Sequence, residues 1–340
     1  MTTATSAPTP PHEGVALFKV MESFVSGYAL LAAAALGIAD ALADGPRTGE
    51  ELAQATDSHA PSLVRLLRLL APEGIVTEVE PGRFALTTLG RSLQTESTPS
   101  VVSWLPLFRF MFPPLAETAH TVRTSQTGFA RQFGMPLYEY LDQHRELDEV
   151  FGRAMNTIRT LFGSIAQAYD FAGTGTLVDV GGGYGWRMIE ALQAYPQMRG
   201  VLFDRPGVVE PAQQALAEAG LSDRCEVVGG SFFDQIPTGG DCYLLSAVIP
   251  NWDDAHALTI LRNTRLAMPD HARLLLFEPV SPAGDEPHIA KTLDLIMLVL
   301  LGGQMRTEAQ LSGLLEAAGL RLTRVIATPS LGAVIEAVPV

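Results

Sequence analysis

Short apolar runs alternate with amphipathic stretches through the second half of the chain. The runs lie at residues 177–180, 200–204, 225–228, 242–245 and 273–277. Most of them are separated by stretches with helical periodicity, at 187–194, 208–219 and 255–267. Near-continuous apolar strands that alternate with helices are typical of a parallel sheet covered on both faces. Beyond a helix near 308–318, the pattern predicts two further strands at 321–325 and 333–337.

The first half of the chain follows a helical period instead. Apolar residues recur at spacings of three to four from Val15 to about Leu93, and Thr48 to Glu51 matches a capped helix start. Apolar pairs near 74–76 and 84–86 predict a short hairpin, which completes a winged-helix-like arrangement. Residues 100–170 are predicted to be helical, with breaks at three proline positions. These are Pro106, Pro113-Pro114 and Pro136.

The composition narrows the function classes. Hydrophobic residues make up 47% and charged residues 18% of the 340 positions, which is enough for a substantial core. The net charge of −14 argues against nucleic-acid and anionic-membrane partners, because these would be repelled. Between residues 40 and 96 there are five Arg, no Lys and nine acidic residues, so the winged-helix segment is not expected to bind DNA. A ligand-sensing regulator remains a second alternative.

The N-terminal sequence and the two cysteines indicate the cellular compartment in which the protein is expected. Residues 1–13 contain Pro8, Pro10 and Pro11, lack a signal-peptide pattern and are expected to form a tail. The longest charge-free apolar stretches, Phe24–Ala39 and Leu295–Gly303, are shorter than the roughly 20 residues that span a bilayer. Cys225 and Cys242 fit a reducing compartment. We therefore expect a cytoplasmic protein without a membrane partner.

A glycine-rich loop follows the first strand of the second half and opens a helix. It reads Asp179-Val-Gly-Gly-Gly-Tyr-Gly185, and glycines allow a ligand to press against the backbone. Trp186 stands where a dinucleotide-binding loop would place its last glycine, and there is no P-loop Gly-Lys-Ser/Thr. The loop therefore predicts a nucleoside ligand without the phosphate geometry of a dinucleotide.

Two further strand ends fit the same ligand. Asp204 ends the second strand, 23 positions after Gly181, where a carboxylate can bind ribose hydroxyls. Ser231 and Phe232 follow the third strand, where a polar side chain and an aromatic ring can flank adenine. An acidic loop start, a ribose carboxylate and an adenine site together predict S-adenosyl-L-methionine, with S-adenosyl-L-homocysteine as the product.

From residue 15 to 338 the chain resembles the bacterial small-molecule O-methyltransferases related to plant caffeate-type and anthracycline-type enzymes. The resemblance is carried by LVDVGGGYG at 177–185, LSDRCEVVGGSFF at 221–233, YLLSAVIPNWDDAHALTILRN at 243–263 and KTLDLIMLVLLGGQMRT at 291–307. It implies an α/β fold with a Rossmann-like class I methyltransferase domain and an N-terminal winged-helix-like dimerisation domain. The expected division is a tail (1–13), the dimerisation domain (14–100), a helical linker with substrate-site helices (101–170) and the cofactor-binding domain (171–340). A homodimer is expected.

The resemblance also assigns site residues. The cofactor is expected to contact Asp179, Gly181, Gly183, Asp204, Ser231, Phe232 and Ser246. The pocket for the methyl acceptor is expected to be lined by Tyr138, Met155, Phe162, Asn251, Trp252, Met297, Leu301 and Met305. His288 stands before the apolar helix that is expected to cover this pocket. Such a lining is apolar and wide, which suits an aromatic, polyketide-like natural product.

Two positions depart from the plant-type members of the family. Pro250 occupies the position of the catalytic His before Asn251-Trp252, and Met305 replaces the Glu that orients that His. Proline cannot accept a proton, so we expect methyl transfer by proximity and orientation, with Asn251, Tyr138 and Glu278 as the polar groups. The missing base leaves an alternative open: non-methylating chemistry with the same cofactor, such as hydroxylation, decarboxylation or cyclisation.

The remaining titratable residues suggest no other centre. No His pair has metal-ligand spacing, so no metal site is expected. His256 is expected to be solvated, and Asp253 and Asp254 to cap the helix that follows them. The chain is thus predicted to be an S-adenosylmethionine-dependent O-methyltransferase of secondary metabolism, with an acceptor and a site of methylation that the sequence does not identify.

Overall fold

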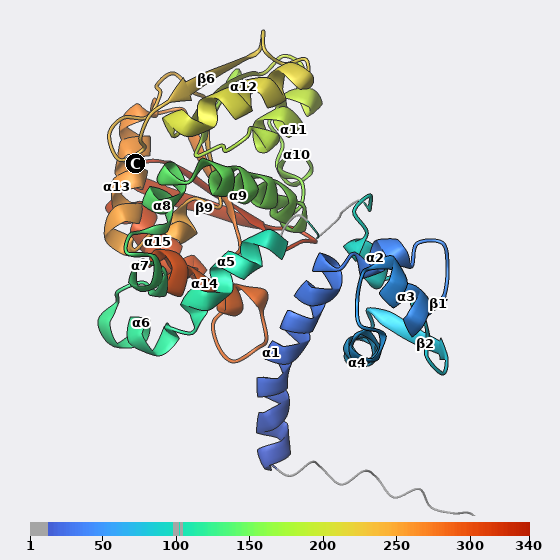
Figure 1. Ribbon diagram of the computed structural model, residues 1–340. Coiled ribbons are helices and arrows are strands. Elements are labelled where there is room, and N and C mark those ends of the chain that lie inside the picture. The colour runs from blue at the N-terminus through green and yellow to red at the C-terminus, as the bar shows by residue number, and fades with distance from the viewer. Residues whose placement is uncertain (1–12, 98–101, 103–104) are drawn as a thin grey trace, which may run out of the picture. The chain divides into compact units, whose positions relative to one another are not determined.

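The computed structural model describes residues 13–97, 102 and 105–340, and it divides the chain after residue 108 into two compact units (Figure 1). The predicted tail lies almost wholly outside the described residues. Each unit has its own sheet and its own hydrophobic core.

The N-terminal unit combines helices with a three-stranded antiparallel sheet in the order β1-β3-β2. Its elements are α1 (Glu13–Ala35), α2 (Ile38–Ala41), β1 (Arg47–Thr48), α3 (Gly49–Ala55), α4 (Ala60–Leu70), β2 (Val76–Glu80), β3 (Arg83–Leu86) and η1 (Gly90–Leu93). The predicted helix start at Thr48 is a capping box, in which its hydroxyl accepts from Glu51 N at 3.2 Å and its N–H donates to the Glu51 carboxylate at 2.8 Å. Leu63 and Leu67 of α4 pack with Phe84 of the hairpin, which gives the predicted helices-plus-hairpin arrangement.

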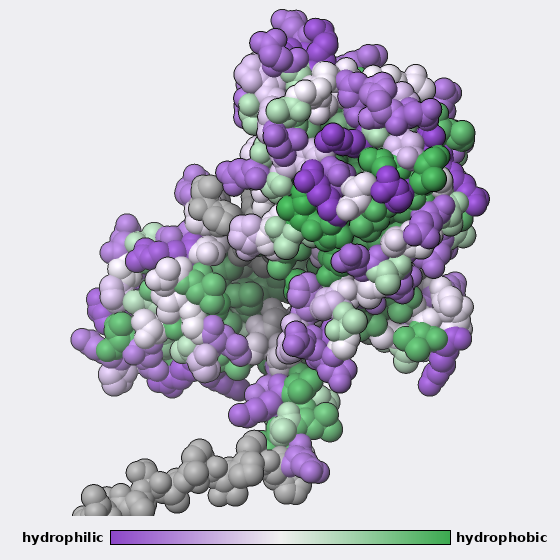
Figure 2. All heavy atoms as spheres, turned by 180° about the vertical axis from the view of Figure 1, so that it is seen from behind, coloured by the Kyte–Doolittle hydropathy of each residue, from purple (hydrophilic) through white to green (hydrophobic). Residues whose placement is uncertain are grey.

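Helix α1 exposes a row of large apolar side chains. Leu17, Phe18, Met21 and Phe24 are each between 63% and 66% exposed, and green surface marks this helix beside the grey N-terminal trace in Figure 2. By length and composition, α1 is apolar enough to cross a membrane. This corrects the expectation that no segment reaches spanning length, because charged residues interrupt the apolar run without ending the helix. An apolar face of this size requires a partner surface.

The sequence between the two predicted domains forms a series of short helices. They are α5 (Leu105–Leu115), α6 (Thr118–Thr124), α7 (Gly128–Phe133), α8 (Leu137–Gln143), α9 (Arg145–Ile158), η3 (Arg159–Phe162) and α10 (Ile165–Ala168). Pro136 stands at the N-cap of α8, as a break should. Pro113 and Pro114 were expected to break a helix but lie inside α5, which ends at Leu115. Each lacks the N–H that would donate to the carbonyl four residues earlier, and the helix ends within two residues of them.

The second unit is built on a seven-stranded sheet in the order β6-β5-β4-β7-β8-β10-β9. The strands are β4 (Thr176–Val180), β5 (Arg199–Asp204), β6 (Cys225–Gly229), β7 (Cys242–Ser246), β8 (Arg273–Glu278), β9 (Leu320–Ala327) and β10 (Ala333–Pro339). The first five pair in parallel, whereas β10 is antiparallel to both of its neighbours. Every predicted strand is present.

Helices cover both faces of this sheet (Figure 1). They and the linking turns are α11 (Trp186–Ala194), η4 (Pro206–Val208), α12 (Val209–Glu218), η5 (Ile249–Asn251), α13 (Asp254–Ala267), α14 (Ile289–Leu301) and α15 (Glu308–Ala317). Neighbouring strand residues belong to different core clusters: Leu274 packs with the cluster of α13 and α15, and Leu275 with that of α11 and α12. Side chains that alternate between two clusters show that helices cover both faces of the sheet. Because β6, β5, β4, β7 and β8 are parallel, their carboxyl ends lie at one edge of the sheet, where open α/β sheets bind their ligands.

Candidate active site

The glycine loop between β4 and α11 has the conformation that its sequence predicts. Gly181 and Gly183 have φ angles of 74° and 56°, in the left-handed region that favours glycine. Gly181 N donates to Phe203 O at 2.8 Å, which joins the loop to β5. A Cβ on Gly181 would lie 2.8 Å from the Val248 side chain, so only glycine fits without displacement. At Gly183, by contrast, a Cβ would meet nothing within 4 Å, so the loop has open space on that side.

Asp204 ends β5 beside this loop. One carboxylate oxygen accepts from Gly183 N at 2.7 Å, and the other accepts from Arg205 N at 2.7 Å. Burial raises the pKa of Asp204, while these two amide hydrogen bonds act in the opposite direction. The structure thus brings together the loop and the carboxylate that the sequence assigned to ribose binding.

Asp179 lies on the neighbouring strand β4. Its side chain is completely buried, and neither carboxylate oxygen has a hydrogen bond to any residue that the structure describes. Burial is the main reason that its pKa rises to about 7; the nearby charge of Asp204 adds to this, and Arg187 opposes it. A buried, unsatisfied carboxyl at a strand end is typical of a binding site.

The predicted adenine residues follow β6. Asn263 Nδ2 donates to Phe232 O at 2.9 Å, and Ser231 Oγ accepts from Phe233 N at 3.2 Å, so both are held by the protein's own contacts. The Phe232 ring meets the edge of Trp252 with centroids 5.8 Å apart. Ser246 ends β7 on the same edge of the sheet. A row of aromatic rings therefore leads from the adenine residues toward the predicted acceptor residues.

The acceptor residues Tyr138, Asn251 and Trp252 lie in direct contact. Tyr138 stacks on Trp252 with centroids 5.8 Å apart, and Asn251 Nδ2 donates to the Tyr138 hydroxyl at 3.0 Å. The same amide nitrogen donates to Ala247 O at 3.0 Å, and Asn251 Oδ1 accepts no hydrogen bond from the residues that the structure describes. Burial raises the pKa of Tyr138, so the phenol stays protonated at neutral pH.

Ala247, which receives the second of these bonds, has a strained backbone. Its φ is 55°, although it is not a glycine, and its N–H donates to Phe277 O at 3.0 Å. Residues held in the left-handed region concentrate at functional sites. Ala247 joins Ser246, a predicted cofactor residue, to the turn that carries Asn251.

Glu278 is the acidic group behind this turn. It is 2% exposed, and its Oε2 is buried without a hydrogen-bond partner in the described part of the chain. Burial raises its pKa to about 8, while the charge of Arg306 opposes the shift. Arg306 itself donates to Asp254 Oδ1 from Nε and Nη2, at 2.9 and 2.8 Å. The cap of α13 is therefore Asp253 alone, which accepts from His256 N at 2.9 Å, and Asp254 was wrongly expected to share that role.

The other predicted lining residues are spread over several elements. Leu301 of α14 packs in the same cluster as Tyr138, whereas Phe162 packs with the core cluster of α11. Met305 is buried, and its N–H donates to Asp294 Oδ1 at 2.7 Å. Met155 lies on α9 and Met297 on α14, and both are half-buried. These positions remain a prediction.

No histidine in the described part of the chain replaces the missing base. His288 is exposed and caps α14, where its Nδ1 accepts from Ala290 N at 3.2 Å. His256 is exposed and bonds Asp253, as expected for a solvated residue, and His271 bonds Asp241 at 3.1 Å. No group of three or more metal-ligating side chains occurs among the described residues.

Two features of the site went unnoticed in the sequence. Arg205, next to Asp204, forms ion pairs with Asp142 of α8 and with Asp148 of α9, the latter at 3.1 Å, and its guanidinium lies over the Tyr138 ring. Tyr184 of the glycine loop lies against Gly152 of α9, where a Cβ would come within 2.5 Å of its ring. In the sequence, only the adjacent Asp204 and Arg205 indicate a charged cluster at this strand end. The other contacts join segments that are far apart in the chain.

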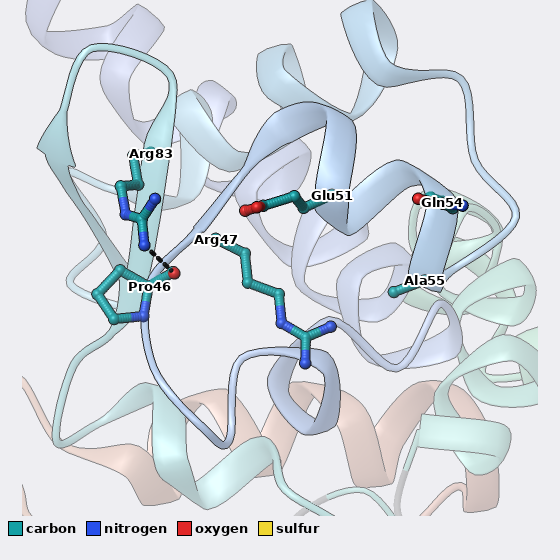
Figure 3. Close-up of a pocket in the computed structure, with 6 residues that line it drawn as sticks. All are labelled: Pro46, Arg47, Glu51, Gln54, Ala55 and Arg83. Atoms are coloured by element: carbon teal, nitrogen blue, oxygen red, sulfur yellow. Dashed lines mark hydrogen bonds between the residues drawn. The ribbon is translucent and has the colours of Figure 1, made fainter.

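The surface also has shallow cavities away from these residues. One, of about 400 Å³, lies in the N-terminal unit between Pro46, Arg47, Glu51, Gln54, Ala55 and Arg83 (Figure 3). There Arg83 donates to Pro46 O at 2.9 Å, so part of the lining is already satisfied. A second, of about 330 Å³, lies at the opposite ends of β4, β5 and β6. Neither contains a predicted site residue.

Comparison with known proteins decides the family. The sequence-family model of the O-methyltransferase domain matches residues 114–321. The family model of the O-methyltransferase dimerisation domain matches residues 18–96. The chain belongs to the O-methyltransferase family. This methyltransferase is 41% identical over 332 residues to the phenazine O-methyltransferase PhzM of Lysobacter antibioticus, covering 96% of this chain and 97% of the relative.

Solved structures agree with the fold of this methyltransferase. The crystal structure of CalO1, a methyltransferase in calicheamicin biosynthesis in its S-adenosylhomocysteine-bound form, has a TM-score of 0.86 at 36% identity, covering 98% of this chain and 100% of that one. NcsB1 from neocarzinostatin biosynthesis, in complex with S-adenosylhomocysteine and 1,4-dihydroxy-2-naphthoic acid, has a TM-score of 0.79 at 35% identity, covering 92% and 95%. The predicted fold, enzyme class and cofactor are confirmed.

One relative has a different activity. The aclacinomycin 10-hydroxylase RdmB of Streptomyces purpurascens is 35% identical to this methyltransferase over 314 residues, covering 90% of this chain and 84% of the relative. The same scaffold therefore carries a hydroxylase as well as methyltransferases.

Proposed function

We propose that this enzyme transfers a methyl group from S-adenosylmethionine to a phenolic hydroxyl of an aromatic natural product in secondary metabolism. The observation that carries the proposal is the continuity of the site. The loop with its unsatisfied Asp179 leads through Phe232 and Trp252 to Tyr138, so a nucleoside site adjoins an aromatic one. The names of relatives that act on phenazine and bind a naphthoic acid support an aromatic acceptor.

The residues present fit the cofactor. Asp179 has no hydrogen-bond partner among the described residues, so its carboxylate could bind the methionine end of the cofactor. Gly181 and Gly183 lie beside it, with open space at Gly183, and Asp204 would supply a carboxylate for ribose. Ser231 and Phe232 would flank the adenine, and Ser246 would contact the cofactor from β7. When bound, S-adenosylmethionine supplies an electrophilic methyl group on a cationic sulfur. Carboxylates around a cation are favourable electrostatically.

The chain's own part in the reaction is to orient the acceptor. Trp252 and Tyr138 provide a flat aromatic surface, and Asn251 Oδ1 accepts a hydrogen bond from the acceptor hydroxyl. As the hydroxyl oxygen bonds to the methyl group, its proton passes to solvent water. Tyr138 remains a neutral donor. Alignment of this kind replaces a strong base, because effective concentration alone can lower a barrier by about 7–11 kcal/mol. Glu278, with its pKa of about 8, is the proposed buried acid behind the turn.

A non-methylating use of the same cofactor is the second candidate. It is favoured by Pro250 and Met305 at the positions of the family's base and orienting acid, and by the similarity to a hydroxylase. The third candidate, a ligand-sensing regulator, has only the winged-helix-like arrangement in its support. A gel shift with random DNA at low salt should show no complex, because the net charge is −14.

We also propose a homodimer in the cytoplasm. The exposed apolar face of α1 lies mostly within the matched dimerisation domain, so a second copy is the partner that fits it. Sedimentation should give twice the mass of the chain, and flotation with lipid vesicles should leave the protein unbound. Binding to vesicles instead would assign the α1 face to a membrane.

The metabolites of the producing organism provide the test of the activity. Mass spectrometry should compare strains with this gene intact and deleted, and purified protein should then be incubated with S-adenosylmethionine and the accumulated compound. A compound lighter by one methylene, which the protein then methylates, supports the proposal. A compound that differs by an oxygen, by carbon dioxide or only in connectivity refutes it in favour of the second candidate.

A further inference from the structure

The turn that carries Asn251 is held by a segment far away in sequence, residues 302–306. Gln304 N donates to Pro250 O at 2.9 Å. Arg306, only 2% exposed, donates from Nη1 to Ile249 O at 3.2 Å and from Nη2 to Trp252 O at 2.9 Å. Backbone carbonyls of the turn η5 are thus satisfied from outside it, and their donors fix its position.

Gly303 brings the two segments into backbone contact. A Cβ at this position would lie 2.1 Å from Pro250 O and 2.5 Å from the carbonyl carbon of Asn251. Both atoms belong to backbone, so no side chain can rotate away to make room. The φ of Gly303 is not in the left-handed region, so the requirement for glycine is steric rather than conformational.

The same segment connects the turn to α14. Met305 N donates to Asp294 Oδ1 at 2.7 Å, and Gly303 N donates to Met297 O at 3.2 Å. Helix α14 carries Met297 and Leu301, two of the proposed acceptor-lining residues. One short segment therefore sets the spacing between the turn with Asn251 and the helix on the other side of the acceptor.

We propose that Gly303 and Arg306 are positioning residues, which hold the turn at 249–252 so that Asn251 and Tyr138 align the acceptor. The proposal rests on the proposed methyl transfer, in which alignment replaces a base. Pro250 and Met305 lack the chemistry of the family's His and Glu, yet the backbone around them is joined by the hydrogen bonds above. This region thus has a fixed backbone geometry for orientation but no proton-transfer group at Pro250 or Met305.

Gly303→Ala tests the role of the close approach. Moving a Cβ from 2.1 Å to the 3.4 Å of an ordinary contact requires a shift of about 1.3 Å, since 3.4 − 2.1 = 1.3. A misplacement of about 1 Å can lower a rate about 100-fold. The expected result is a kcat lower by about 100-fold. The Kd for S-adenosylhomocysteine, measured by calorimetry, should stay within about twofold of the original, because Asp179 and Asp204 lie on β4 and β5 and not in the segment 302–306.

Gly313→Ala is the matched control. Gly313 lies on α15, and a Cβ there would meet nothing within 4 Å, so kcat should stay unchanged. If Gly303→Ala keeps the same kcat as this control, the positioning role is refuted. An equal loss of cofactor affinity and kcat would also refute it, because the effect would then be a general loss of structure.

Arg306 provides an independent second test. Arg306→Lys keeps the positive charge beside Asp254 but has fewer hydrogen-bond donors, and Arg306→Gln removes the charge. The expected kcat order is the unsubstituted enzyme, then Arg306→Lys, then Arg306→Gln, at constant cofactor affinity; equal kcat for all three refutes the role of Arg306. Absence of transfer by the unsubstituted enzyme would refute methyl transfer and this proposal together. Transfer by that enzyme with unaffected variants would refute positioning alone.

Discussion

Replacing Glu278 by glutamine should change how the stability of the protein depends on pH. Glu278 is completely buried and its pKa is raised from 4.5 to about 8, chiefly by burial. The folded protein therefore keeps the Glu278 proton at pH values where the unfolded chain has lost it. The stability from this group is fully present below pH 4.5 and is lost as the pH rises through about 8.

The size of the effect follows from the two pKa values. Their difference is 8 − 4.5 = 3.5, which corresponds to about 5 kcal/mol over the full range at about 1.4 kcal/mol per pKa unit. Between pH 5.5 and 9 the same linkage removes about 3 kcal/mol, because part of the range lies below pH 5.5. Glu278→Gln has no proton to lose and should not show this component.

Urea unfolding of the cofactor-free protein at several pH values is the suitable assay. The free energy of unfolding of the original protein minus that of Glu278→Gln should fall by about 3 kcal/mol from pH 5.5 to 9. Asp179, whose pKa is raised to about 7, contributes a similar slope to both proteins and cancels in the difference. Glu226→Gln, at an exposed residue on β6, is the control. Parallel curves for the original protein and Glu278→Gln would refute the reasoning.

Three other substitutions probe the rest of the site. Asp204→Asn should weaken cofactor binding in calorimetry by about tenfold or more, through loss of a charged hydrogen bond; unchanged affinity would exclude Asp204 from the ribose site. Tyr138→Phe removes an acceptor of the Asn251 amide and should lower kcat by about tenfold while the Kd for S-adenosylhomocysteine holds, and equal losses in both would argue against its acceptor role. Ala247→Gly should raise the free energy of unfolding by about 1 kcal/mol in urea, since glycine adopts a φ of 55° without strain, and a decrease would contradict this.

The fold was predictable because its signals are local. The strands of the second unit are five to eight residues long and most contain a short apolar run, and the capping box at Thr48 lies within four positions. The glycine loop and Asp204 could be singled out for the same reason, since the loop follows directly after β4 and Asp204 is the last residue of β5. Helix α1 begins well before the charge-free stretch at Phe24, because the exposed Lys19 and Glu22 lie on it without ending it.

What the sequence could not show depends on contacts between distant segments. Arg306 joins residues 254 and 249 across about fifty positions, and no local pattern separates it from a surface arginine. Asp254 looked like a capping residue because it stands at a helix start, but its oxygen is occupied by that arginine. The pairing of Arg205 with Asp142 and Asp148 likewise appears only once α8 and α9 are placed against β5.

The contact between Gly152 and Tyr184 has a consequence for how this sequence can change. Gly152 lies in the middle of α9, where glycine is less favourable than alanine by about 1 kcal/mol. Alanine there would require the Tyr184 side chain to move, because its Cβ would come within 2.5 Å of the Tyr184 ring. The two positions are thus expected to covary among relatives: a larger residue at 152 should be found mainly where 184 is smaller.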